Sequence, residues 1–376
     1  MKQILTNGRI FSGDEILPGW SLRLGDGLIQ DLLPPGTLTD DAPVIDLGGG
    51  LLAPGFIDSQ VNGGGGVLFN DHPDLAGIKA IAGAHRAFGA TGLLPTLISD
   101  DLASMTAAVD AIAAARQQEN SGVLGLHFEG PYLNPARKGA HDGGQIRPFD
   151  DVLFELLAAR DLGAVVVTLA PEMVQPGTIR RMTDAGICVC AGHSAADHEQ
   201  TMAALDEGLA GFTHLFNAMP AMASRDPGIV GAALVDENSF CGIIADGHHV
   251  HPTTLRVALA AKERGKMMLV SDAMPSVGGS GASFQLAGQT VSVTGGRCTL
   301  DDGTLAGSNL DMASAVRNTV KLLQQPLEEA LRMASLYPSR FLGLERERGR
   351  IAAGYRADLV LLDEELNVRR TWIGGT

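Results

Sequence analysis

The chain has 376 residues, of which 45% are hydrophobic, enough for one large domain or for one large and one small domain. Its 28 basic and 43 acidic residues leave a net charge of −15, which argues against nucleic acid and anionic membrane surfaces as partners. No apolar run approaches the roughly 20 residues of a membrane span. The four cysteines form no CxxC pair, and the first residues lack the apolar core of a secretory signal, so we expect a reduced, cytoplasmic protein.

The two ends of the chain have a similar character. Residues 1–53 consist of short predicted strands separated by glycine-rich turns, and residues 344–376 resemble them. Neither segment is long enough to enclose a core of its own. We therefore predict that residues 1–53 and 344–376 join in one small β-sandwich domain.

The middle of the chain, residues 54–343, repeats one pattern eight times. Short apolar runs end at Asp58, Ser99, Gly130, Glu172, Ser194, Ala218, His249 and Met274. Alanine-rich helical stretches are expected between them at residues 75–88, 103–116, 151–159, 195–207 and 253–264, and after the last run at 310–323. Continuous apolar runs are typical of strands buried on both faces, as in a parallel sheet covered by helices. Eight such units predict a (β/α)₈ TIM barrel.

Two glycine-rich segments need separate interpretation. The run of glycines after Asn62 lacks the G-x-G-x-x-G pattern of a strand that turns directly into a helix, so a dinucleotide-binding sheet is disfavoured. A second segment, residues 283–304, is predicted to form a β insert after the eighth strand.

Chemically active residue types gather at the ends of the predicted barrel strands. Glu129, His193 and His214 end strands three, five and six, and active sites of such barrels are built from these carboxyl ends. A carboxylate with two imidazoles binds a divalent cation such as Zn²⁺ and leaves a position open for water. Taken singly, each histidine has the alternative role of a packed or hydrogen-bonded core residue. Glu129 and Asp272 are harder to explain in that way, because carboxylates are almost never buried without a partner.

Asp272 is the candidate general base. It follows the eighth apolar run, where a carboxylate can take a proton from an activated water and return it to a leaving nitrogen. A capping or turn role for this aspartate is the alternative.

Several longer motifs carry a family resemblance. They are "PGFIDSQVNGGGG", "GLHFEGPYLNPARKGAH", "AGHSAA", "FTHLFNAMPAM", "RDPGIVGAAL", "ADGHHVHP", "VSDAMP" and "LAGSNLDM". Over nearly its whole length the chain resembles the N-acetylglucosamine-6-phosphate deacetylases of the amidohydrolase superfamily. The resemblance implies a (β/α)₈ barrel beside a small β-sandwich. It also implies removal of the acetyl group from N-acetyl-D-glucosamine 6-phosphate, which yields D-glucosamine 6-phosphate and acetate.

The resemblance also implies a role for individual residues. Glu129, His193 and His214 match the metal ligands, Asp272 the catalytic acid and base, and His141 a histidine that polarises the acetyl carbonyl and stabilises the oxyanion. The expected substrate contacts are Asn217, Ala218, Arg225 and His249 at the phosphate and Leu305 in the wall of the sugar pocket. The resemblance places Arg225 across the interface of a homodimer. Where relatives commonly have Gly-Leu-His, this chain has Gly247-His248-His249, and the direction of the His248 side chain stays open.

Gln60 and Asn62 end the first predicted strand and point the same way, because residues two apart on a strand share a face. In superfamily members with two metals, a His-x-His pair at this place binds the second ion. Amides are poor Zn²⁺ ligands beside imidazole. We therefore predict one divalent metal per subunit, Zn²⁺ first, with Fe²⁺, Mn²⁺ or Co²⁺ as alternatives, and a vacated second position where both amides form hydrogen bonds.

Three other functions compete with this hypothesis. A deacetylase of N-acetylgalactosamine 6-phosphate or a related amino sugar would use the same site. A cyclic-amide hydrolase is less expected, because those enzymes pair His-x-His with a lysine at a strand end and Lys138 lies in a loop. A non-catalytic sugar-phosphate sensor is disfavoured by the intact set of Glu129, His193, His214 and Asp272.

Overall fold

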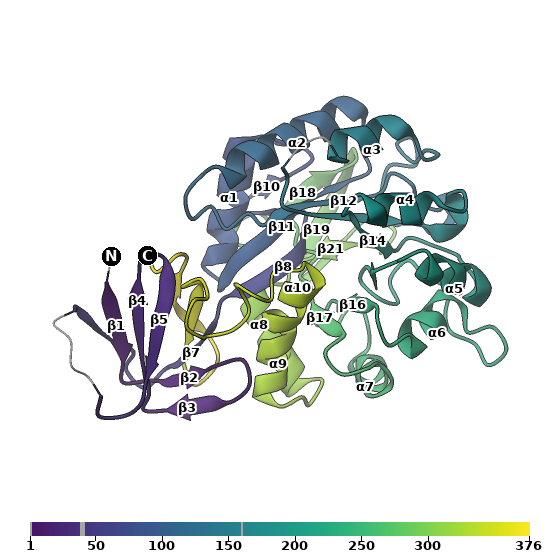
Figure 1. The fold of residues 1–376 in the computed structure, drawn as a ribbon. Helices are drawn as coiled ribbons and strands as arrows, with labels where there is room; N and C mark the ends of the chain where they lie inside the picture. Colours follow the sequence, from purple (N-terminus) through teal and green to yellow (C-terminus); the bar gives the residue numbers. More distant parts are fainter. Residues whose placement is uncertain (1, 38–41, 159–160) are drawn as a thin grey trace.

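The computed structural model describes residues 2–37, 42–158 and 161–376. It has two main parts, an eight-stranded parallel barrel surrounded by helices and a β-sandwich that contains both ends of the chain (Figure 1). This architecture confirms the predicted fold.

The barrel strands follow one another in sequence order, each paired in parallel with the next. They are β8 (Phe56–Val61), β11 (Ala90–Ile98), β12 (Gly125–Glu129), β13 (Ala164–Leu169), β14 (Cys188–Ala191), β15 (Gly211–Phe212), β16 (Phe240–Ile243) and β17 (Met267–Leu269). Each predicted apolar run overlaps one of them. The chain beyond β17 closes the barrel against β8, since the Asp272 amide donates to the Gln60 carbonyl at 3.0 Å and the Asn62 amide donates to the Ala273 carbonyl at 3.0 Å.

Helices cover the outside of the barrel. They are α1 (Leu75–Arg86), α2 (Leu102–Arg116), α3 (Asp151–Ala158), α4 (Thr178–Asp184), α5 (His198–Asp206), α6 (Gly228–Val235), α7 (Pro252–Ala261), α8 (Met312–Lys321), α9 (Leu327–Ala334) and α10 (Leu336–Phe341). Each of the six expected helical stretches overlaps a helix, although Ala159 lies outside the described residues. The expected starts at 195 and 310 were early, because Asp197 and Asp311 cap these helices with side-chain oxygens that accept from backbone amides. Helix α6 escaped prediction because it is apolar on every side and so lacks an amphipathic period.

The β-sandwich is built from residues at opposite ends of the chain. One sheet has the order β5 (Leu28–Leu33), β4 (Ser21–Gly25), β1 (Gln3–Thr6) and β6 (Val44–Asp46). The other has the order β23 (Val368–Trp372), β22 (Leu359–Leu362), β7 (Leu51–Pro54), β2 (Arg9–Phe11) and β3 (Ile16–Pro18). A core that includes Leu5, Leu22, Leu52, Leu359 and Trp372 lies between the sheets.

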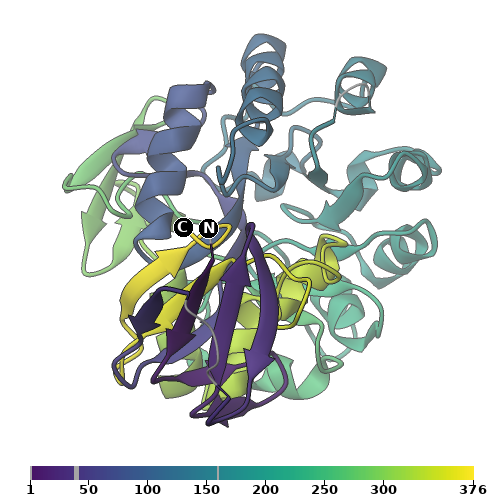
Figure 2. The same ribbon diagram turned by 60° about the vertical axis from the view of Figure 1, so that its left-hand side comes forward.

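The termini lie close together in both views (Figures 1 and 2), and the Gln3 side chain donates to the Gly375 carbonyl. These contacts support the proposed division into residues 1–53 plus 344–376 and residues 54–343, whose boundaries stay a prediction.

A separate antiparallel sheet follows β17. It comprises β18 (Ser283–Leu286), β19 (Gln289–Thr294), β20 (Arg297–Thr299) and β21 (Leu305–Ser308), so the predicted insert exists and runs slightly beyond residue 304. Figure 2 shows this sheet in pale green, apart from the purple and yellow sandwich. Its apolar side packs on Leu68, Ile98 and Met274, at one edge of the barrel mouth.

The remaining elements are short: β9 (Gly63–Gly64), β10 (Val67–Leu68) and two 3₁₀ turns at Pro135–Arg137 and Pro171–Met173. Among the described residues, no helix combines the length and apolar character that crossing a membrane requires.

Candidate active site and metal centre

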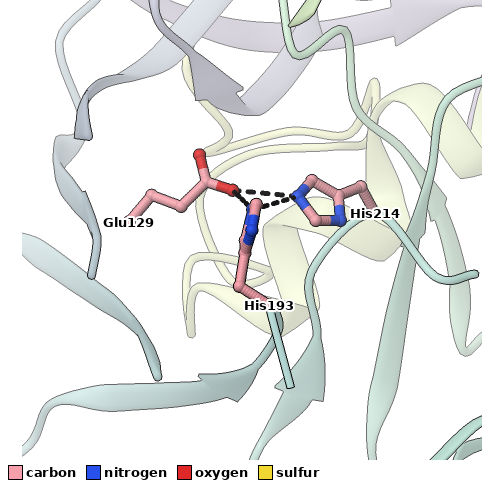
Figure 3. Close-up of side chains that lie close together, drawn as sticks. All are labelled: Glu129, His193 and His214. Carbon is pink, nitrogen blue, oxygen red and sulfur yellow. Dashed lines mark hydrogen bonds and ion pairs between the residues drawn. The ribbon is translucent and has the colours of Figure 1, made fainter. Parts of the chain in front are cut away.

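Three of the predicted site residues converge at the mouth of the barrel (Figure 3). Glu129 is the last residue of β12, and His193 and His214 follow the ends of β14 and β15. Glu129 Oε1 lies 2.9 Å from Nε2 of His193 and 2.9 Å from Nε2 of His214, and the two Nε2 atoms are 3.1 Å apart. All three side chains are buried. A carboxylate oxygen and two imidazole nitrogens therefore face one point.

The surroundings of this cluster prepare it to hold a cation. The His193 Nδ1 lies 2.9 Å from the Arg137 carbonyl, which can only accept, so Nδ1 carries a proton and Nε2 is the ring nitrogen that faces the cluster. Burial raises the pKa of Glu129, but the hydrogen bonds and charges of the two histidines outweigh burial and hold that pKa well below its usual range. An ionised carboxylate that faces the Nε2 atoms of two imidazoles fits a divalent cation of the Zn²⁺ type.

The backbone is strained where it presents these side chains. His193, His214 and Asp272 have φ angles of +49°, +30° and +51°, in the left-handed region that residues other than glycine rarely adopt. Ala218, which follows β15 in the same loop, has a φ of +53°. Such strain persists only where the surrounding structure enforces it, and it concentrates at functional sites.

Asp272 lies beside the cluster and is held by the side-chain amides of Gln60, in strand β8, and of Asn62, which directly follows that strand. Its Oδ1 accepts from Asn62 Nδ2 at 2.6 Å and from Gln60 Nε2 at 3.2 Å. The Gln60 amide also donates to Glu129 Oε2 at 3.2 Å. Burial, and then the negative charge of Glu129, raise the pKa of Asp272 to about 6. Both amides thus serve as donors to carboxylates, the kind of contact predicted for them.

His141 is oriented by a residue at the end of β11. The Ser99 amide donates to His141 Nδ1 at 3.4 Å, and the Ser99 hydroxyl lies 3.0 Å from the same nitrogen. Because a backbone N–H can only donate, Nδ1 is the acceptor and Nε2 carries the proton. Burial, and then the charge of His193, lower the pKa of His141 to about 3, so its ring is a neutral donor.

A cavity of about 520 Å³ is lined by Asn62, Glu129, His141, His193, His214 and Asp272. Its lining also includes the polar residues Asn217 and His249. Leu68, Ile98 and Leu286 belong to an apolar cluster and line the same cavity. The cavity can therefore hold a ligand that carries both polar and apolar groups beside the cluster.

Comparison with known proteins agrees with this geometry. A model described as "Amidohydrolase family" matches residues 51–376, and one described as "NagA composite domain" matches residues 4–52. The chain belongs to the amidohydrolase family.

Curated relatives match this amidohydrolase over almost its full length. It is 41% identical to the N-acetylgalactosamine-6-phosphate deacetylase of Shewanella sp. (strain ANA-3), with 99% of this chain and 95% of that protein covered. It is 38% identical to the N-acetylglucosamine-6-phosphate deacetylase of Homo sapiens, with 98% and 94% covered.

A solved structure of N-acetylglucosamine-6-phosphate deacetylase from Pasteurella multocida superimposes with a TM-score of 0.96 at 33% identity, covering 100% of this chain and 99% of the other. The enzyme of that name from Mycobacterium smegmatis gives 0.90 at 30% identity, with 99% of each chain covered.

The residues expected at the substrate divide into two groups in this amidohydrolase. Asn217, Ala218, His249 and Leu305 line the cavity together with His141. Arg225 is exposed and does not line the cavity of its own chain.

Two neighbouring histidines of the loop after β16 point to different partners. His249 Nδ1 lies 2.6 Å from Asp246 Oδ2, so this aspartate orients the ring at the cavity. His248 instead accepts from Arg297 Nε of strand β20 at 3.1 Å, which answers the open question of its direction. It faces the β insert.

Sequence reasoning missed two residues that hold the site together. Ser99 orients His141, although its position at the end of an apolar run was visible. Glu172, at the end of the fourth run, accepts from Asn134 at 2.9 Å, from the Ser194 hydroxyl at 2.7 Å and from the Ala195 amide at 2.6 Å. It therefore holds the two residues that directly follow His193 and joins them to the loop that carries Asn134. Its place at a strand end was the available signal.

Proposed function

We propose that this amidohydrolase removes the acetyl group from N-acetyl-D-glucosamine 6-phosphate, giving D-glucosamine 6-phosphate and acetate. The observation that carries the proposal is the convergence of Glu129, His193 and His214 beside Asp272 within one cavity. The names of the full-length relatives supply the class of substrate.

One divalent cation per subunit is proposed, held by Glu129 Oε1 and the Nε2 atoms of His193 and His214. Zn²⁺ suits this donor set best, and Fe²⁺, Mn²⁺ and Co²⁺ are alternatives. When bound, the cation would lower the pKa of a water toward 7 and polarise the amide carbonyl. A second ion is not expected, because Gln60 and Asn62 turn their amide N–H groups toward carboxylates instead of offering lone pairs.

The protein's own groups manage the protons. With Oδ1 engaged by Asn62 and Gln60, Oδ2 of Asp272 has no hydrogen bond to the described residues and takes the proton of the attacking water. The same oxygen returns that proton to the amide nitrogen as the C–N bond breaks. His141 donates from Nε2 to the acetyl oxygen, on which negative charge develops in the tetrahedral intermediate.

Phosphate recognition is assigned to polar groups that line the cavity. Asn217, Ala218 and His249 would contact the phosphate, with Leu305 against the sugar. A chain of net charge −15 needs a dedicated cation for this anion, and Arg225 presents paired N–H donors. Because Arg225 lies outside its own cavity, we propose a homodimer in which it reaches the partner subunit's site. The free cysteines support a cytoplasmic location.

N-acetyl-D-galactosamine 6-phosphate is a second candidate substrate. Relatives from Shewanella and Escherichia coli that carry its deacetylase name are 41% and 38% identical to this chain. The two sugars differ only in the configuration at C4, away from the acetamide, so the proposed chemistry serves both.

Acetate release from both sugar phosphates, measured on protein of known metal content, tests the proposal. We expect turnover of the glucosamine compound with one metal per chain, and the ratio of the two kcat/KM values identifies the better substrate. Binding of either compound without any acetate release in metal-loaded protein would indicate a sensor and refute the enzymatic proposal.

A further inference from the structure

Polar side chains fill the barrel interior one layer below the candidate metal ligands. His127 Nδ1 lies 3.2 Å from Thr96 Oγ1, and its Nε2 lies 2.8 Å from Thr168 Oγ1. Thr168 Oγ1 is in turn 2.6 Å from Thr213 Oγ1. The Thr96 hydroxyl also accepts from the Val61 amide at 2.9 Å. We call Thr96, His127, Thr168 and Thr213 the threonine–histidine layer. Together with the Val61 amide, this layer links strands β8, β11, β12 and β13 to Thr213, the residue that follows β15.

This layer is unusual for the inside of a barrel. Its members are between 0% and 6% exposed, a depth usually filled by branched apolar side chains. Its polar atoms are hydrogen-bonded to one another, which offsets the cost of burying them. Apolar groups of the same shape would be about as stable at such a place. Stability alone therefore does not explain the layer, whereas hydrogen bonds also impose fixed distances and directions between strands.

Two of the metal ligands are attached directly to this layer. His127 lies two residues before Glu129 on β12, so both side chains point into the barrel from the same face. Thr213 is the residue immediately before His214. A shift of either layer member would move the ligand that follows it.

The third ligand rests on the layer through a glycine. Gly192 precedes His193, and a Cβ atom placed on Gly192 would lie 2.7 Å from Thr168 Cγ2 and 3.1 Å from Thr213 Cβ. The backbone there is thus in direct contact with both threonines. Immediately afterwards His193 adopts its left-handed φ of +49°, and His214 adopts +30° directly after Thr213. The layer therefore supports the backbone next to His193 and His214, the two ligands that have a strained backbone.

We propose that the threonine–histidine layer positions the three metal ligands and thereby sets the affinity of the site for its divalent cation. His127 is the central positioning residue, because it bridges Thr96 and Thr168 across three strands. The inference rests on the proposed metal site, and it is tested by metal affinity instead of acetate release.

The decisive pair of variants separates hydrogen bonding from packing. Thr168→Val keeps the branched shape against Gly192 and removes the hydroxyl that bonds His127 and Thr213. Thr168→Ser keeps the hydroxyl and removes the methyl group. Metal-free, full-length protein is titrated with Zn²⁺ in competition with a chromogenic chelator. We expect Thr168→Val to raise the Kd for Zn²⁺ about tenfold, and Thr168→Ser to stay within about threefold of wild type, by analogy with partners that orient ligands.

Two other buried threonines are matched controls. Thr201 and Thr319 are 0% exposed, and their hydroxyls donate to helix carbonyls at 2.7 and 2.8 Å away from the site. Thr201→Val and Thr319→Val should lower the unfolding temperature of the metal-free protein much as Thr168→Val does. Their Kd for Zn²⁺ should equal that of wild type.

Two results would overturn the inference. The first is a Thr168→Val protein with wild-type affinity for Zn²⁺ and only the stability loss of the controls. The second is a Thr168→Ser protein that binds as weakly as Thr168→Val, which would assign the effect to packing on Gly192. If Thr168→Val does not fold, Thr96→Val removes the other partner of His127 and is judged by the same Kd. Wild-type protein that binds Zn²⁺ but releases no acetate would refute the proposed function and leave the affinity comparison intact.

Discussion

Replacement of Asp272 by asparagine keeps the shape of the side chain and removes its charge. Oδ1 of Asp272 accepts from Asn62 at 2.6 Å and from Gln60 at 3.2 Å, and the amide oxygen of asparagine can accept from both donors. The oxygen that the variant loses is Oδ2, the proposed proton carrier. Since the converging ligand atoms belong to Glu129, His193 and His214, we expect the variant to keep its metal.

The effect on turnover follows from the loss of a general base. Such groups contribute about 10²- to 10⁴-fold to the rate, so Asp272→Asn should lower kcat by that factor. This corresponds to about 3–5 kcal/mol of transition-state stabilisation.

Asp272→Asn should lower turnover but raise the free energy of unfolding of the metal-free protein at pH 7. Burial and Glu129 raise the pKa of Asp272 from 3.8 to about 6, so the folded protein binds this proton more tightly than the unfolded chain. Its contribution to the free energy of unfolding therefore falls as the pH rises from about 4 to 6. At pH 7 the ionised Asp272 carboxylate lowers the free energy of unfolding by about 1–3 kcal/mol. Asparagine avoids it, so the metal-free variant should be more stable than wild type at pH 7 and lose this advantage at pH 4.

Asp246→Asn is the matched control. Burial raises the pKa of Asp246, but its hydrogen bond to His249 and the charge of that ring outweigh burial and lower it. The ionised Asp246 thus stabilises the fold above the pKa of the unfolded state, and this stabilisation disappears as the pH falls through the lower folded-state pKa. Asp246→Asn should therefore destabilise the protein at pH 7.

Denaturant unfolding of the metal-free proteins, acetate release and metal analysis measure the three quantities. Near wild-type turnover in Asp272→Asn would remove this residue from the mechanism. If the metal-free Asp272→Asn variant is less stable than wild type at pH 7, the ionised carboxylate does not destabilise the fold.

Three further predictions concern the same site. Asp272 must be ionised to accept a proton, so kcat/KM should fall as the pH is lowered. The midpoint of this fall should lie at or below pH 6, because a bound cation can only lower the Asp272 pKa of about 6. A midpoint above pH 7 would contradict the assignment. His141→Asn should lower kcat about 10²- to 10³-fold with unchanged metal content, because it removes the donor to the oxyanion, and a change confined to KM would exclude that role. Gln60→His combined with Asn62→His should raise the metal content measured by atomic emission from one to two per chain, and a value that stays at one would show that the second position is absent.

Much of the fold could be predicted because burial leaves a local signature. Strands covered on both faces are continuous apolar runs, and each run from Phe56 to Met274 overlaps a barrel strand. Helix α6 (Gly228–Val235) had no such signature, because a helix buried all round has no polar face. Helix α5 began later than expected because the Asp197 side chain bonds the amide of its first turn.

The candidate site was predictable only through the fold. Glu129 and His214 are separated by 85 residues, and nothing in their immediate neighbours indicates that their side-chain atoms lie 2.9 Å apart. The prediction followed from the rule that carboxyl ends of barrel strands face one mouth. The same rule does not predict that Ser99 sets the tautomer of His141, since that contact depends on the path of the loop that carries His141.

By itself the sequence determined the barrel, the two-part sandwich and the residue types at the strand ends, because these depend on periodicity and burial along the chain. Only the tertiary structure decided which of those residues meet. The direction of His248 toward the insert, the left-handed backbone at His193 and the bridge from Thr96 through His127 to Thr168 all depend on strand register and side-chain packing. Register and packing arise between segments distant in sequence, so no local pattern records them.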